Sequence, residues 1–80
     1  MGIAEFLRQE RYKRCLSQEE MAKKIGVSRA VYVTYENAWV NPKTNKVSVP
    51  GREVTKRIAK FTKTAPEYVL KLIENERREK

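Results

Sequence analysis

The sequence contains no histidine, and Cys15 is its only cysteine. These absences exclude an internal disulfide and a zinc site of the Cys/His type, and they remove the most common general base. The glutamates fall mostly on the surfaces of predicted helices, and no nucleophile is paired with a base. We therefore expect a protein that is not an enzyme and that holds no metal or cofactor.

Long apolar runs are also missing. No stretch approaches the roughly 20 residues that a membrane-spanning helix needs. Near the N-terminus, Glu5 and Arg8 interrupt the hydrophobic segment that a signal peptide requires. These features predict a soluble cytoplasmic protein without a membrane partner.

Positive charge is in excess. The chain has 18 Lys and Arg against 10 Asp and Glu, a net charge of +8. The basic residues are spread along the sequence, so they do not form a disordered basic tail, and they favour binding to a polyanion. Nucleic acid is the most common polyanion and an anionic membrane the second. The 80 residues, 40% of them hydrophobic, predict one small globular domain over 1–80.

The first half of the chain carries clear helix signals. Apolar residues at helical spacing predict a helix over residues 3–14 with basic side chains on its far side. Ser17 and Glu20 have the spacing of a capping box that opens a second helix. Gly26 ends that helix, and Ser28 is the natural N-cap of a third one running to about residue 36 or 37. Its β-branched residues leave a strand as the local alternative.

The second half is less regular. Residues 38–50 predict a long loop or a short β-hairpin. Pro50 is expected to start a fourth helix, and Thr64 with Glu67 to cap a fifth. The polar residues 74–80 are expected to fray.

The segment from Leu16 to Asn37 reads LSQEEMAKKIGVSRAVYVTYEN. Counted from Gln18, the fourth, fifth, eighth, ninth and tenth residues are Met, Ala, Ile, Gly and Val, and the fifteenth and eighteenth are Tyr. This pattern resembles the helix-turn-helix of the Cro/lambda-repressor-like (Xre-type) family, whose members commonly read close to L-S/T-Q-E-E-L-A-x-K-x-G-V-S-R-x-x-I-S-x-x-E-N. The glycine turns the chain, the alanine lets the two helices cross, and the two tyrosines bury the second helix against the first. The resemblance covers residues 3–37 well and 50–73 loosely.

The resemblance implies an all-α, five-helix lambda-repressor-like domain, with the helix-turn-helix at about 17–37 and a long loop, 38–50, between helices three and four. The third helix, 28–37, would enter the DNA major groove, and its outer side chains would face base edges. Residues in the loop would contact the DNA backbone, which positions the protein without specifying a sequence. The candidate DNA-binding residues are Gln18, Ser28, Arg29, Ala30, Val33, Thr34, Asn37, Lys43 and Lys46. In this family an arginine of helix one often pairs with a glutamate at the end of helix three, and these positions are Arg11 and Glu36 here.

Several positions depart from the family pattern. Cys15 and Ala38 stand where glycine is usual, so we expect the ends of helices one and three to be shaped differently. Thr62 stands near a usual core leucine. The 38–50 loop is longer than usual and could serve as an extra DNA-contacting arm or as a specificity element for another protein. Trp39 in this loop is expected to pack beneath it, the alternative being contact with a partner.

Together these observations predict a sequence-specific regulator of transcription that binds double-stranded DNA, a repressor of the phage Cro-like or antitoxin-like kind. It would bind a palindromic operator as a homodimer, with half-sites roughly 34 Å apart. The dimer would form through Tyr68, Leu72 and Ile73 or through the loop with Trp39. A regulatory protein could also bind it. The alternative function is a protein-interaction module, such as an antirepressor or antitoxin that acts mainly by binding another protein.

Overall fold

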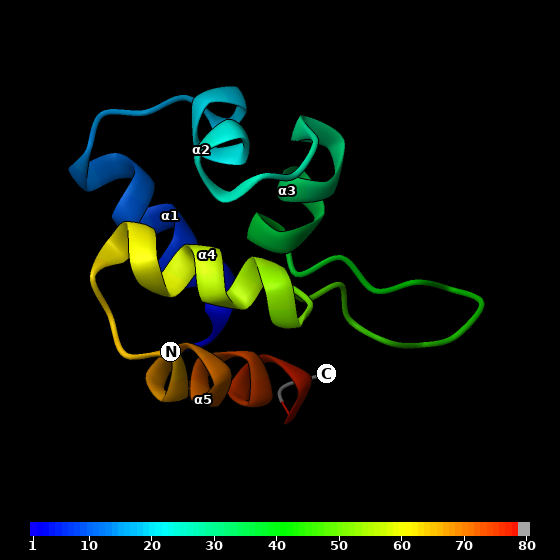
Figure 1. The fold of residues 1–80 in the computed structure, drawn as a ribbon. Coiled ribbons are helices and arrows are strands. Elements are labelled where there is room, and N and C mark those ends of the chain that lie inside the picture. The colour runs from blue at the N-terminus through cyan, green and yellow to red at the C-terminus, as the bar shows by residue number, and fades with distance from the viewer. Residues whose placement is uncertain (79–80) are drawn as a thin grey trace.

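The computed structural model describes residues 1–78, which form five helices and no β-strand. The helices are α1 (Ile3–Lys13), α2 (Gln18–Ile25), α3 (Arg29–Glu36), α4 (Arg52–Thr62) and α5 (Pro66–Arg78). α1 packs on α3 and α5, and α4 packs on α2 and α5, so that α3 and α5 lie on different sides of the bundle (Figure 1). The predicted all-α, five-helix architecture is confirmed. None of the helices within residues 1–78 has the length and apolar character to cross a membrane.

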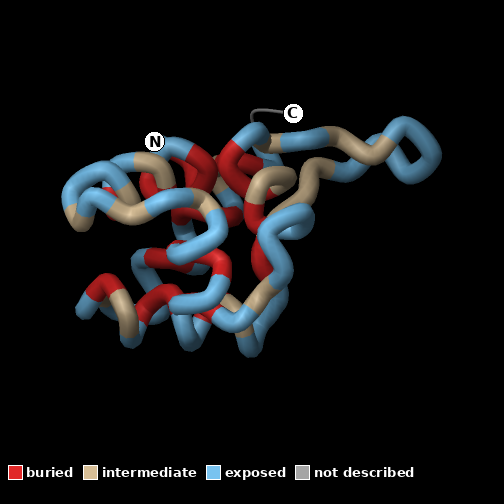
Figure 2. Tube along the Cα trace, turned by 90° about the horizontal axis from the view of Figure 1, so that it is seen from above, coloured by how far each residue is buried: buried red, intermediate tan, exposed pale blue. Residues whose placement is uncertain are grey.

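All five helices contribute to one core, seen as the buried segments in Figure 2. Its members are Ile3, Phe6, Leu7, Met21, Ala22, Ile25, Tyr32, Tyr35, Ile58, Ala59, Val69, Leu72 and Ile73. Burial of each large side chain contributes roughly 1.5–3 kcal/mol to the stability of the domain. Tyr32 and Tyr35 anchor α3 to this core, which leaves the opposite side of α3 at the surface.

The α2–turn–α3 unit is built by local capping. The Ser17 hydroxyl accepts from the Glu20 amide at 3.1 Å, and the Glu20 carboxylate accepts from the Ser17 amide at 2.9 Å, forming the predicted capping box. Gly26 ends α2 in the left-handed conformation, with φ 76°, which costs glycine nothing. The Ser28 hydroxyl then accepts from the Val31 amide at 3.2 Å and caps α3.

The turns that follow α1 and α3 are left-handed although neither contains glycine. Cys15 has φ 55° and Ala38 has φ 49°. The expectation that these helix ends would be shaped differently is therefore wrong. The surrounding contacts impose the conformation that glycine favours, at a cost of about 1–2 kcal/mol for each residue with a Cβ.

The starts of α4 and α5 differ from the prediction. α4 begins at Arg52 and not at Pro50, because Gly51 is still extended, with ψ −177°. Thr64 does not form a capping box, since its hydroxyl is hydrogen-bonded to Thr62 at 3.0 Å. α5 instead begins directly at Pro66.

The predicted fraying of the C-terminal residues is wrong for residues 74–78, which are helical; 79–80 lie outside the described residues. Glu76 is only 5% exposed, and its carboxylate accepts from the Ala4 amide at 2.9 Å. The Asn75 side chain donates to the Met1 carbonyl at 3.2 Å. The last turns of α5 therefore cap the start of α1.

Residues 38–50, called the arm below, project from the bundle beside α3 (Figures 1 and 2). A single antiparallel bridge joins Val40 to Val47. The Ser48 amide donates to the Trp39 carbonyl at 2.7 Å, and the Asn41 amide donates to the Lys46 carbonyl at 2.9 Å. The arm thus combines the two predicted alternatives, being a long loop with one hairpin bridge.

Candidate nucleic-acid interface

The outer side of α3 carries four of the candidate residues. Arg29 and Ala30 are exposed, and Val33 and Thr34 are half-buried. The helix is only two turns long, so its position depends on the contacts behind it rather than on its own stability.

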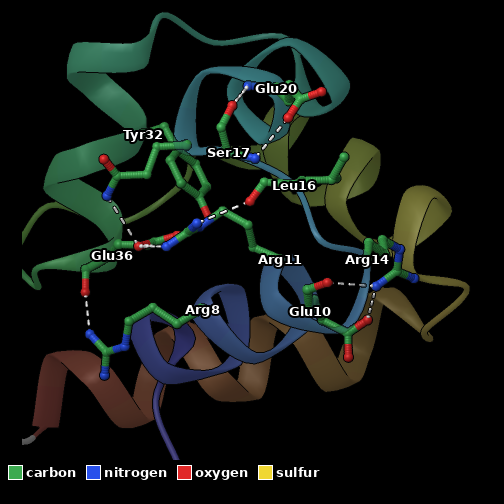
Figure 3. Close-up of polar contacts among 10 residues, drawn as sticks. Arg8, Glu10, Arg11, Arg14, Leu16, Ser17, Glu20, Tyr32 and Glu36 are labelled. Carbon is green, nitrogen blue, oxygen red and sulfur yellow. Dashed lines mark hydrogen bonds and ion pairs between the residues drawn. The ribbon is translucent and has the colours of Figure 1, made fainter.

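Those contacts meet at Glu36, at the end of α3 (Figure 3). The side chain of Glu36 is only 2% exposed. Its carboxylate accepts from Arg11 Nε at 2.6 Å and Nη2 at 3.2 Å, from Gln18 Nε2 at 3.3 Å, and from the Tyr32 hydroxyl. The cluster joins α1, α2 and α3, and the structure brings Arg11 and Glu36 together as the resemblance implied.

The cluster holds a buried carboxylate in its charged form. Burial alone would raise the pKa of Glu36, but hydrogen bonds from Arg11, Tyr32 and Gln18 outweigh it and hold the pKa below its ordinary value. The hydrogen bond to Glu36 raises the pKa of Arg11 against the effect of desolvation. Burial, and next the neighbouring carboxylate, raise the pKa of Tyr32. The pair is thus a charged bridge at neutral pH.

Two arginines of α1 hold the helix-turn-helix from behind. Arg8 Nη1 donates to the Glu36 carbonyl at 2.6 Å, which satisfies an orphan carbonyl at the end of α3 (Figure 3). Arg11 Nη1 donates to the Leu16 carbonyl at 3.0 Å. Both arginines were expected among the basic side chains on the far side of this helix, and both are half-buried against the end of α3. The resemblance implied the role of Arg11, whereas for Arg8 the only signal was its spacing, three residues before Arg11 on one helical face.

The polar groups of other candidate residues are already engaged within the protein. Gln18 Nε2 bonds to Glu36, and the Ser28 hydroxyl caps α3. The Thr34 hydroxyl donates to the Val31 carbonyl at 2.6 Å and lies 2.8 Å from the Ser48 hydroxyl. The DNA contacts of Gln18, Ser28 and Thr34 remain predictions, and for Thr34 the methyl group is the part suited to one.

The remaining candidates lie at the surface around α3. Asn37 is exposed at the end of the helix, and Lys43 and Lys46 are exposed on the arm. Trp39 is 48% exposed, so the expectation that it packs beneath the loop is wrong. The arm extends away from the helices instead of folding over them (Figure 2), and its returning end packs on the core through Val49.

The predicted dimer surface on α5 is partly used by the core. Leu72 and Ile73 are 2% and 4% exposed and pack inside the bundle, so they cannot meet a second subunit. Tyr68, the third residue predicted for this dimer surface, is 46% exposed, and Leu70 is 53% exposed. These two side chains and Trp39 are the apolar groups available on the two surfaces considered.

The electrostatics of α3 and the arm are one-sided. From Ser28 to Gly51 the only acidic residue is Glu36, which is buried and paired. The basic residues of the same segment, Arg29, Lys43 and Lys46, are all exposed. A segment without exposed carboxylates and with three exposed cations attracts a polyanion such as DNA. Within residues 1–78, no three His, Cys, Asp or Glu side chains are grouped so as to hold a metal ion.

These features define a helix-turn-helix DNA-binding domain. Two helices are joined by a tight glycine turn, the second helix is held by the core, and its outer side is exposed and cationic. The sequence profile of the Helix-turn-helix family (HTH_3) matches residues 7–69. The chain therefore belongs to this family, which is of the Xre/lambda-repressor type. No curated protein and no solved structure matches the chain.

Proposed function

We propose that the protein is a sequence-specific regulator of transcription that binds double-stranded operator DNA in the cytoplasm, with the N-terminal half of α3 in the major groove. The observation that carries this proposal is the outer side of α3. It exposes Arg29 and Ala30, while the Arg11–Glu36 pair fixes the helix from behind. A short, rigid helix of this kind presents few side chains in a defined geometry, as base reading requires.

The residues of α3 suggest what is read. Arg29 can donate two hydrogen bonds to the O6 and N7 atoms of guanine. Ala30, Val33 and the Thr34 methyl group can contact the methyl group of thymine. Asn37 lies at the end of the helix and Lys43 and Lys46 on the arm, where they would bind phosphates and fix the register of the protein on the duplex.

We further propose that two copies bind a palindromic operator and that binding represses transcription. One domain of this size contacts only a few base pairs. Two copies related by a two-fold axis would double the contacts, and the operator would mirror that symmetry.

Selection of bound sequences from a pool of randomised duplexes tests the proposal. The expected result is enrichment of one motif with two inverted half-sites. Equal binding of all duplexes, with a steep dependence on salt, would overturn it, because it would leave charge-driven association alone. An absence of DNA binding at moderate salt would favour the protein-interaction module instead.

A further inference from the structure

A groove separates α3 from the arm. Its volume is about 460 Å³. Its walls are mainly apolar and include Ala30, Val31, Thr34, Trp39, Val47 and Val49. Val31 is 41% exposed and Trp39 is 48% exposed, an unusual loss of burial for a domain with so small a core.

The arm is fixed to α3 at its base, so the groove has a defined shape. The Trp39 amide donates to the Thr34 carbonyl at 3.0 Å. This bond ties the start of the arm to the last turn of α3. From the returning side of the arm, the Ser48 hydroxyl lies 2.8 Å from the Thr34 hydroxyl. Both sides of the arm are therefore bonded to the same residue of the proposed recognition helix.

The charges around the groove indicate what fits it. Arg29 lies at the N-terminal end of α3, and Lys43 and Lys46 lie on the outer part of the arm, with no exposed carboxylate in the segment that contains them. At roughly 3.3 Å per residue, Lys43 lies up to about 10 Å along the chain beyond Val40. Both lysines therefore lie beyond the bridged residues, at the outer end of the arm.

A second copy of the chain fits the groove less well. The exposed arms of two copies would bring four lysines together, and a lysine or proline on an edge opposes pairing between ribbons. Lys43 and Lys46 lie in the turn between the bridged residues Val40 and Val47, as does Pro42. A DNA strand has the opposite charge and offers the apolar faces of its sugars.

Resting on the function proposed above, we infer that the groove holds one sugar–phosphate strand of the operator beside the major groove. The deoxyribose rings pack on Trp39 and Val31, and the flanking phosphates meet the arm lysines, Lys43 and Lys46. The protein thus binds one DNA strand between α3 and the arm, and its contacts extend beyond the base pairs that α3 reads.

Trp39 is the only tryptophan, so its fluorescence reports on this groove alone. In the wild-type protein we expect a saturable change in emission when the selected duplex is added. A change that instead follows protein concentration in the absence of DNA would show that a second copy occupies the groove, and it would overturn the inference.

The decisive comparison is hydroxyl-radical footprinting with Trp39→Ala, with Leu70→Ala as the matched loss of an exposed apolar side chain on α5. Circular dichroism first establishes that both variants fold. We expect Trp39→Ala to bind about 10-fold more weakly or worse, to lose protection of the sugars flanking the half-site, and to keep the selected motif. Leu70→Ala is expected to keep the protection.

The lysines give an independent measurement. The double variant Lys43→Ala/Lys46→Ala is expected to lower the slope of log affinity against log salt by about 1.8, since each phosphate contact contributes about 0.9. Unchanged protection in Trp39→Ala together with an unchanged slope would overturn the inference while leaving the proposed function intact, provided that the wild type selects a motif. If the wild type selects none, the proposed function fails and this inference fails with it.

Discussion

Among single residues, Glu36 links the stability of the domain to its binding surface. Its carboxylate bonds to Arg11, Gln18 and Tyr32, and Arg8 binds its carbonyl. A buried charge left without partners is costly, so every member of the cluster is constrained by the others. An 80-residue domain has only about 4–12 kcal/mol of stability, and the loss of one charged bond removes a large part of it.

The pH dependence of stability tests the charge state of this residue. Because the pKa of Glu36 lies below its ordinary 4.5 in the folded state, its contribution is fully present above the unfolded-state pKa and is lost as pH falls through the folded pKa. We expect Glu36→Gln to lower the unfolding free energy by about 1.5–3 kcal/mol at neutral pH and to flatten its fall below about pH 5.

Denaturant unfolding from pH 3 to pH 7 measures this effect. Part of the acid dependence will remain in the variant, since the pKa values of Glu10 and Glu20 are also lowered. Parallel curves for the wild type and Glu36→Gln would show that Glu36 does not titrate as described.

Arg29 tests base reading at the same scale. Arg29→Ala is expected to relax discrimination at one base position by about 1–3 kcal/mol, because the two hydrogen bonds to guanine are lost. Lys60→Ala, a change of an exposed lysine on α4, is the control and is expected to weaken all sequences alike. Competition binding against single-position operator variants measures both. If Arg29→Ala leaves affinity and motif unchanged, the placement of α3 in the groove is wrong.

At the scale of elements, the turns after α2 and α3 differ in backbone strain. Ala38 has φ 49° and Gly26 has φ 76°, both in the left-handed region. We expect Ala38→Gly to stabilise the domain by roughly 0.5–1 kcal/mol, since the relief of strain exceeds the entropy that glycine adds to the unfolded chain. The melting temperature should rise by roughly 2–8 °C.

Gly26→Ala is the opposite change and should destabilise by about 1–3 kcal/mol. A Cβ at this position would also overlap the Arg57 guanidinium, which would have to move. Calorimetry on both variants measures the pair. Stabilisation by both changes, or by neither, would contradict the conformations described for these turns.

The elements that the sequence predicted well are those with local signals. Ser17 with Glu20, Gly26 and Ser28 set the ends of α2 and α3 through contacts within a few residues, so spacing alone locates them. Spacing alone does not show which of two competing local contacts forms. Thr64 has the right spacing for a capping box, but Thr62 competes for its hydroxyl.

The candidate site shows the same division. The outer residues of α3 follow from helical periodicity, whereas the engagement of Gln18 with Glu36 joins residues 18 positions apart, and the Thr34–Ser48 contact joins residues 14 apart. Trp39 was expected to be packed because tryptophan usually is. Its exposure depends on the direction of the arm, which no local pattern encodes.

At the scale of the whole molecule, α3 and α5 lie on different sides of the bundle, joined through α1 and α4. The exposed side of α5, with Tyr68 and Leu70, is therefore available to other contacts in the proposed complex with DNA. Any second subunit must keep two copies of α3 on the same side of the duplex. This requirement makes the spacing of the half-sites a property of the dimer and not of one domain.

The spacing of the half-sites tests the proposed dimer. Two copies should bind with half-site centres about 10–10.5 base pairs apart, or a multiple of this, and insertion of about 5 base pairs should abolish joint binding by placing the half-sites on opposite faces. Band-shift titration on spaced operators measures this, with a single half-site as the control. Equal affinity at every spacing would show that the copies bind independently.

The bond between Glu76 and Ala4 has a consequence for biosynthesis. It joins residues 72 positions apart and satisfies a buried amide at the start of the first helix. A nascent chain cannot make this bond until residue 76 has left the ribosome. A premature stop codon shortly before residue 76 would leave that amide buried and unpaired, at a cost of about 1–3 kcal/mol. Quality control by proteases would then act on a chain truncated within the last turns of α5.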